Sequence, residues 1–229
     1  MNTQHNSIPN NYDDIELLLA YTEGQNKELA KSINDECVNV VLLKNILENL
    51  RSVLDYIAID LATLTGDRNR NIFFPYGRRQ NHFKISIKRN LPKLQEKRPD
   101  LFNEIEKIQP FISKNNWLVE LCELTNSAKH IGLNKTNKQK SVSIEISDII
   151  KVQSATEAII ENNYINGFDT GRIRIQDGNI IEKTEGQIKM EVTINNKVKF
   201  AGKEIEILTF TSQVFLEVKT LFLKIYNKI

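Results

Sequence analysis

The sequence is poor in the residues that build metal centres and disulfide frameworks. Its 229 residues contain two cysteines and three histidines. Cys37 and Cys122 both lie in apolar helical patterns, which is typical of buried free thiols rather than of a disulfide pair. The histidines are isolated along the chain, so they do not supply the closely spaced ligands of a zinc site. We therefore expect no metal site and no cofactor.

Long apolar runs are also lacking. No stretch of about 18 apolar residues occurs, which argues against a membrane-spanning helix. The first ten residues have neither the basic start nor the apolar core of a signal peptide. The glycine-rich phosphate loops and the usual serine and zinc hydrolase signatures are missing as well. We therefore expect a cytoplasmic protein that contacts no membrane.

The net charge is small, but the charges are unevenly placed. The whole chain carries +2, whereas residues 66–99 contain ten basic and two acidic side chains, which favours a polyanionic partner. Aromatic residues lie among these cations, and single-stranded nucleic acid binds such mixtures through its phosphates and base faces. The alternative is a solvated loop whose rings, Phe74 above all, fill the core. The candidate nucleic-acid-binding residues are Arg68, Arg70, Arg78, Arg79, Lys84 and Lys129.

Apolar residues that recur every three or four positions predict most of the helices. The predicted helices cover about residues 14–33, 35–64, 91–97, 100–108, 113–131 and 208–228. The helix at 35–64 has the longest pattern, and Gly66 is expected to end it. Residues 67–90 lack this period. They predict a turn at 73–77 and an extended segment at 83–87.

Alternation of apolar and polar residues predicts a small antiparallel sheet in the second half of the chain. Residues 141–146 alternate in this way. One hairpin is expected to turn at Asp177–Gly178 and a second at Asn195–Asn196. Residues 134–140 are interpreted as a polar linker.

These patterns together predict an α+β fold. It is mainly an α-helical bundle with a small antiparallel β-sheet insertion and a C-terminal helix. The expected organisation is a disordered tail at 1–12, a helical bundle at 13–138, the β insertion at 139–207 and a helix at 208–229 that packs back on the bundle.

Two sets of polar side chains are candidate site residues. Glu123, Asn126 and His130 lie at i, i+3 and i+7 on one flank of their helix. In one interpretation His130 acts as a general acid and base and Asn126 orients its imidazole. In the other, these residues form an ordinary polar helix end. Arg51 and Asp55 lie at i, i+4, either as an exposed ion pair or as a pair covered by another helix beside a cleft. The candidate catalytic residues are His130, Asn126 and Arg51.

Four short motifs follow one another along the chain. They are Asn-Leu-Arg-Ser-Val-Leu-Asp-Tyr-Ile-Ala at 49–58, Phe-Pro-Tyr at 74–76, Gln-Pro-Phe at 109–111 and Asn-Ser-Ala-Lys-His at 126–130. Over about residues 35–132 this order resembles a set of bacterial proteins of unassigned role. That set in turn resembles the HEPN group of four-helix bundles. Ribonucleases of that group carry an arginine and then, after four to six residues, a histidine, and no histidine here has that partner.

The resemblance implies a HEPN-like bacterial protein that binds RNA or a nucleotide, in a defence or toxin-related context. It also implies weak, metal-independent ribonuclease activity and a homodimer. The alternative is a non-catalytic protein–protein interaction module whose sheet or bundle face docks a partner. Convergence of His130, Arg51 and the basic segment in one cleft would favour the first function over the second.

Overall fold

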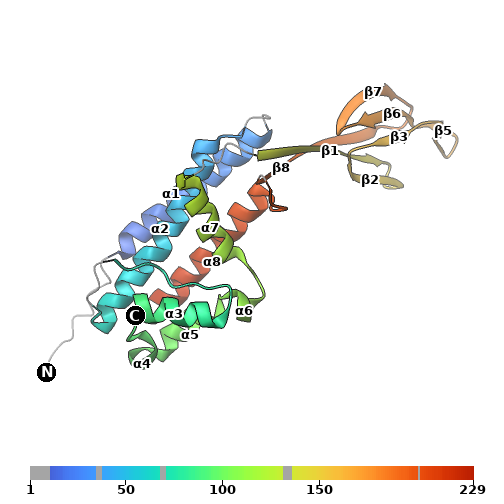
Figure 1. The fold of residues 1–229 in the computed structure, drawn as a ribbon. Helices are drawn as coiled ribbons and strands as arrows, with labels where there is room; N and C mark the ends of the chain where they lie inside the picture. The colour runs from blue at the N-terminus through green and yellow to red at the C-terminus, as the bar shows by residue number, and fades with distance from the viewer. Residues whose placement is uncertain (1–10, 35–37, 68–70, 131–135, 201) are drawn as a thin grey trace. The chain divides into compact units, whose positions relative to one another are not determined.

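The computed structural model of the protein describes residues 11–34, 38–67, 71–130, 136–200 and 202–229 (Figure 1). Its helices and antiparallel strands confirm the expected α+β class. The chain forms two compact units. The helical unit comprises residues 1–29, 39–134 and 208–229, and the sheet unit comprises residues 30–38 and 135–207.

The described residues form eight α-helices. They are α1 (Tyr12–Asn34), α2 (Val40–Thr65), α3 (Gln80–Asn90), α4 (Leu94–Lys97), α5 (Pro99–Lys107), α6 (Pro110–Ser113), α7 (Trp117–His130) and α8 (Ile207–Tyr226). The predicted long helices correspond to α1, α2, α7 and α8, and the two predicted short helices correspond to α4 and α5. None of the helices in these ranges is long and apolar enough to cross a membrane.

Helix α2 lies at the centre of the helical unit because it is apolar on several sides. Leu47 and Leu50 are both fully buried. The helix begins later than expected because the Asn39 side chain accepts a hydrogen bond from the Leu42 N–H at 3.0 Å and caps it. It ends at Gly66, as the sequence predicts.

A buried carboxylate joins the far ends of α1 and α8 to α2. Asp60 is 4% exposed. It accepts hydrogen bonds from the Asn11 side-chain amide at 2.7 Å and from the Tyr226 hydroxyl. Burial, and then the hydrogen bond to Asp60, raise the pKa of Tyr226. The Tyr12 ring lies 5.2 Å from the Phe222 ring in the same cluster. The C-terminal helix is therefore fixed against the bundle by polar and aromatic contacts.

Helix α3 overturns the extended conformation expected at residues 83–87. Phe83, Ile85 and Ile87 alternate along the chain like a strand. In the structure Phe83 and Ile87 are buried one helical turn apart, whereas Ile85 is 68% exposed. The alternation thus reflects an exposed isoleucine on a helix, and Asn90 continues the buried side.

The sheet unit contains three small antiparallel sheets. Its strands are β1 (Thr136–Ile146), β2 (Ile150–Ala155), β3 (Ala158–Ile160), β4 (Tyr164–Ile165), β5 (Phe168–Asp169), β6 (Gly171–Gln176), β7 (Asn179–Glu185) and β8 (Met190–Phe200). The strand orders are β2-β1-β8, β3-β6-β7 and β4-β5. Isoleucines from β1, β3, β4 and β6, with Met190, form the core of this unit.

The predicted hairpin at Asp177–Gly178 is confirmed as the β6–β7 turn. The predicted second hairpin is wrong, because β8 continues through Asn195 and Asn196 and pairs with β1 along its whole length. There the Asn195 amide donates to the Ser143 hydroxyl at 2.9 Å, so a cross-strand hydrogen bond holds the side chain that suggested a turn. Residues 136–140 likewise belong to β1 rather than to a linker.

Candidate nucleic-acid interface

The segment at 73–77 is held in place by backbone hydrogen bonds to side chains of α2 and α3. The Phe74 N–H donates to Asp55 Oδ1 at 2.7 Å, and the Phe73 N–H donates to Asn90 Oδ1 at 3.1 Å. Phe74 is 1% exposed, whereas Phe73 is 50% exposed. One ring therefore fills the core, as the alternative interpretation of the aromatics expects, and its neighbour faces outward.

Gln109 connects two of the short motifs that are distant in sequence. It is fully buried. Its Nε2 donates to the carbonyls of Pro75 at 3.2 Å and Ile105 at 3.0 Å, and its Oε1 accepts from the Gly77 N–H at 3.1 Å. The Gln-Pro motif thus pairs the polar backbone groups of the Phe-Pro-Tyr turn, which would otherwise be buried without partners.

Arg51 is covered rather than exposed, so the interpretation of Arg51 and Asp55 as a solvated surface ion pair is wrong. The two side chains are 14% and 22% exposed, with Nη2 lying 3.4 Å from Asp55 Oδ1. The Arg51 guanidinium also donates to Cys122 Sγ of α7 and lies 5.2 Å from the centre of the Tyr76 ring. Arg51 therefore holds α2, α7 and the 73–77 segment together.

The Cys122 thiol is not a reactive nucleophile. It is 2% exposed, and burial raises its pKa to about 12, although the nearby Arg51 lowers it. The thiol therefore stays protonated at neutral pH. Burial also raises the pKa of Tyr76. Cys122 therefore serves in packing rather than in proton transfer.

Arg78 is engaged within the protein. Its Nη2 lies 2.7 and 2.8 Å from the two carboxylate oxygens of Glu123, and 3.6 Å from Glu120. Its Nε also donates to Glu123 Oε1 at 3.1 Å, so Nε and Nη2 together bind the carboxylate in the bidentate geometry that makes an arginine–carboxylate pair strong. Arg78, predicted to contact nucleic acid, and Glu123, predicted to lie beside the acid–base histidine, therefore neutralise each other.

Two lysines of the basic segment stabilise the end of α2. Lys97 Nζ donates to the Thr65 carbonyl at 2.7 Å and Lys93 Nζ donates to the Gly66 carbonyl at 2.8 Å. Cations are favourable at the negative C-terminal end of a helix. Much of the positive charge at 66–99 thus serves the fold.

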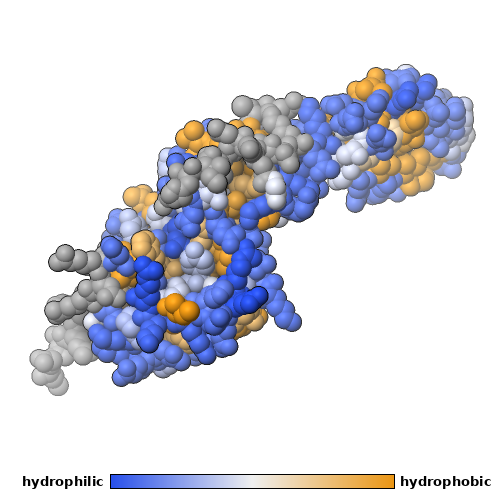
Figure 2. Space-filling view, in the orientation of Figure 1, coloured by the Kyte–Doolittle hydropathy of each residue, from blue (hydrophilic) through white to orange (hydrophobic). Residues whose placement is uncertain are grey.

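Three further cations of the basic segment belong to α3 or its N-terminal end: Arg79 at the N-cap, and Lys84 and Lys88 one turn apart on the helix. Arg79, Lys84 and Lys88 are exposed, and no aspartate or glutamate occurs between Asp67 and Glu96. We call Arg79, Lys84 and Lys88 the α3 surface. In the space-filling view the region of α3 is mostly hydrophilic around a small hydrophobic spot (Figure 2). Helix α3 therefore presents these positive charges and carries no carboxylate of its own.

The other predicted site residues are placed as follows. Asn126 is exposed on α7, one turn beyond Cys122. The backbones of Lys129 and His130 belong to α7, but their side chains lie outside the described residues, as do Arg68 and Arg70. Lys88 was not predicted as a site residue, although its spacing of four from Lys84 could have indicated a shared helix face. Asn90 and Gln109 were not predicted either, because no local pattern marks side chains that bind the backbone of a distant segment.

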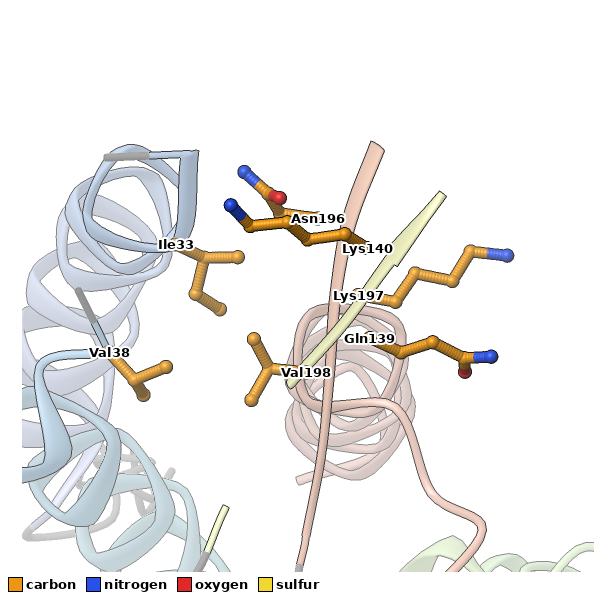
Figure 3. Close-up of a pocket in the computed structure, with 7 residues that line it drawn as sticks. All are labelled: Ile33, Val38, Gln139, Lys140, Asn196, Lys197 and Val198. Carbon is orange, nitrogen blue, oxygen red and sulfur yellow. The ribbon is translucent and has the colours of Figure 1, made fainter. Parts of the chain in front are cut away.

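A small cavity in the sheet unit is no alternative site. Figure 3 shows that Ile33, Val38 and Val198 line it with apolar side chains, while Gln139 and Lys197 extend their polar ends away from it. Its volume of about 20 Å³ is room for about one water molecule.

No family model, curated protein or solved structure matches the chain. Function is therefore inferred from the chemistry of the α3 surface and its surroundings.

Proposed function

We propose that the protein is a HEPN-like bacterial protein that binds RNA or a nucleotide through the α3 surface, in a defence or toxin-related context. The observation that carries the proposal is the exposure of Arg79, Lys84 and Lys88 on a stretch that contains no acidic residue. Lysine and arginine bind phosphates and release the counterions that surround a nucleic acid. An internal carboxylate would weaken such binding, and none lies within α3.

The proposal is tested by reversing the two lysines of α3. Lys84→Glu combined with Lys88→Glu is expected to weaken RNA binding about 100-fold, because each lost charge-assisted contact contributes about 1.5 kcal/mol. The slope of log affinity against log salt is expected to become shallower by about 1.4, as two phosphate contacts to a single strand are lost. Fluorescence anisotropy with a labelled RNA at several salt concentrations measures both quantities.

The matched control reverses two exposed lysines of another helix. Lys219→Glu with Lys224→Glu changes the net charge by the same amount, and both residues lie on α8. Equal losses from the two double variants would mean that net charge, and not the α3 surface, attracts the RNA. Unchanged binding by the α3 variant would remove the proposal.

The cleavage step is proposed to be weak and independent of metal. His130 would take the proton of a ribose 2′-hydroxyl as that oxygen attacks the neighbouring phosphorus, and would then give a proton to the 5′-oxygen that leaves; Asn126 would orient the imidazole, because an ordinary histidine titrates near neutral pH. Arg51 is proposed to support the site from beneath through its contacts to Cys122 and Asp55, since its guanidinium already has these partners.

The expected result for His130→Ala is loss of RNA cleavage with RNA binding retained, since the histidine would move a proton and the α3 surface would hold the phosphates. The assay is cleavage of a labelled RNA in chelator, with binding measured on the same preparation. His82→Ala, which alters an exposed histidine of α3, is the control. If folded His130→Ala cleaves RNA at the parental rate, His130 is not the catalytic residue, and only the RNA-binding part of the proposal remains.

The second proposal is a non-catalytic protein–protein interaction module that docks a second copy or another protein. The outer side of α1 favours it: Leu17 is 70% exposed and Tyr21, one turn later, is 62% exposed. Apolar side chains that lie side by side on a surface often mark an interface. Sedimentation of the purified chain over a range of concentrations distinguishes a dimer from a monomer.

A further inference from the structure

We propose that two copies of the chain associate by pairing their α1 helices antiparallel, about a twofold axis that passes near Ala20. This inference rests on the second proposed function, because it names the partner as a second copy and the docking surface as one side of α1. The residues that carry it all lie within residues 1–29 of the helical unit.

A row of exposed residues runs along one side of α1. The row comprises Asp13, Leu17, Ala20, Gly24 and Lys27, which follow one another at intervals of four, three, four and three positions. At 100° per residue these intervals keep the row within about 80° of the helix circumference. The same alternation of three and four marks the line along which two helices pack side by side. The row therefore has the geometry of a helix–helix contact, although it faces solvent.

The row is complementary to itself when its direction is reversed. Asp13 and Lys27 each lie seven positions from Ala20. When a second α1 runs antiparallel, Asp13 of each copy therefore faces Lys27 of the other, and opposite charges meet at both ends. Leu17 of each copy faces Gly24 of the other, so a large side chain lies over a small one, and the two alanines meet at the axis. A parallel pair would instead set like charges against each other at both ends.

Gly24 has a role in this pair that the contacts of a single copy do not give it. A Cβ at Gly24 would meet nothing within 4 Å, so no neighbour in the same chain requires a glycine there. Glycine in the middle of a helix is unfavourable relative to alanine, because it has more backbone freedom to lose. Between two copies, the missing Cβ leaves room for Leu17 of the second copy and lets the two backbones approach closely.

The flanks of the row limit how tightly the copies bind. Tyr21, which is 62% exposed, extends the apolar part of the row on one side. Three glutamates, Glu16, Glu23 and Glu28, also border the row, and Glu23 lies 3.3 Å from Lys27 of the same helix. These carboxylates repel the acidic residues of a second copy. One helix from each copy also makes a small interface, so we expect a reversible dimer with a dissociation constant on the order of 10 µM.

Two reciprocal charge variants test the pairing. Asp13→Lys sets two positive charges against each other at both ends of the pair, and Lys27→Asp sets two negative charges there. Each variant alone is expected to associate with itself about tenfold more weakly than the parent. An equimolar mixture of the two variants brings opposite charges together at both ends, so it is expected to associate about as well as the parent. Sedimentation velocity from about 1 to 500 µM measures all four samples.

Two further variants serve as controls. Lys224→Asp makes the same charge change at an exposed lysine of α8 and should leave self-association at the parental level. Gly24→Gln puts a larger side chain where Leu17 of the second copy would lie, so it should weaken association about tenfold or more. Because glutamine is a better helix former than glycine, the same variant should keep or raise the melting temperature of the dilute protein. Circular dichroism measures that temperature and the helix content of every variant.

The outcomes separate this inference from the function on which it rests. If the parent dimerises and both charge variants dimerise equally well, the interface lies elsewhere: the pairing of α1 fails and the second proposed function stands. A mixture that associates no better than its two components overturns the antiparallel arrangement. A parent that stays monomeric over the whole range overturns the inference and leaves the second proposed function with another protein as its partner.

Discussion

Replacing Gln109 with alanine is expected to destabilise the helical unit by about 3–5 kcal/mol. The substitution leaves the Gly77 N–H and the Pro75 carbonyl without the partners that Gln109 supplies. A buried polar group that loses its partner costs about 1–3 kcal/mol. The space left by the missing side chain adds a cavity term. Urea unfolding followed by the fluorescence of the single tryptophan, Trp117, which is buried in α7, measures the change.

Two comparisons show whether the hydrogen bonds are responsible. Gln80→Ala, at the exposed first residue of α3, should change stability by less than about 0.5 kcal/mol. Gln109→Glu keeps the shape and the acceptor for Gly77 but sets a carboxylate oxygen against two carbonyls, so it should also destabilise strongly. A loss under about 1 kcal/mol for Gln109→Ala would mean that the 73–77 segment does not depend on this side chain.

Gly171→Ala is expected to destabilise the sheet unit by about 3–5 kcal/mol, from backbone strain and a steric clash together. Gly171 has φ +80°, which side chains rarely adopt. A Cβ there would lie 2.3 Å from the Thr184 carbonyl oxygen and 2.6 Å from the Gly186 nitrogen. Both atoms belong to the backbone, so they cannot move away as the end of a flexible side chain could. Hydrogen exchange of the β6 and β7 amides measures the loss, at about tenfold faster exchange per 1.4 kcal/mol.

Gly167→Ala is the control that measures the cost of the backbone conformation without the steric clash. Its φ of +84° is nearly the same, but a Cβ there would meet nothing within 4 Å. Gly167→Ala should therefore cost only the conformational term, about 1–2 kcal/mol. Equal losses at the two positions would show that the sheet unit accommodates the extra atom at Gly171.

The sequence predicted the helices whose burial follows a regular period. The apolar residues of α2, α7 and α8 recur every three or four positions, and they are buried in the structure. Helix α3 was missed because the exposed Ile85 masks the spacing of Phe83 and Ile87. Strand β8 was predicted as the two strands of a hairpin, for a different reason. Asn195–Asn196 has the composition of a turn, and only the opposing strand, with Ser143, shows that the chain stays extended.

For the candidate site, the sequence shows where the basic residues are concentrated but not which of their side chains are exposed and which are paired within the protein. The basic segment could be read from the sequence, yet the division of its cations depends on residues distant in the chain. Glu123 removes Arg78 from the candidate surface, and the end of α2 engages Lys93 and Lys97. Pairing between residues distant in the chain leaves no pattern in the neighbouring sequence, so it could not be predicted. The burial of Arg51 against Cys122 and Tyr76 could not be predicted for the same reason.

The pairing of β1 with β8 brings together the two ends of the β-rich segment. Thr136 and Phe200 are register partners. The β-rich segment between α7 and α8 therefore begins and ends on neighbouring strands, whose backbones lie about 5 Å apart. A segment whose ends already meet can replace an ordinary loop at little entropic cost, whatever its length. A change in the length of the β-rich segment would therefore not alter the distance that the chain bridges between Thr136 and Phe200.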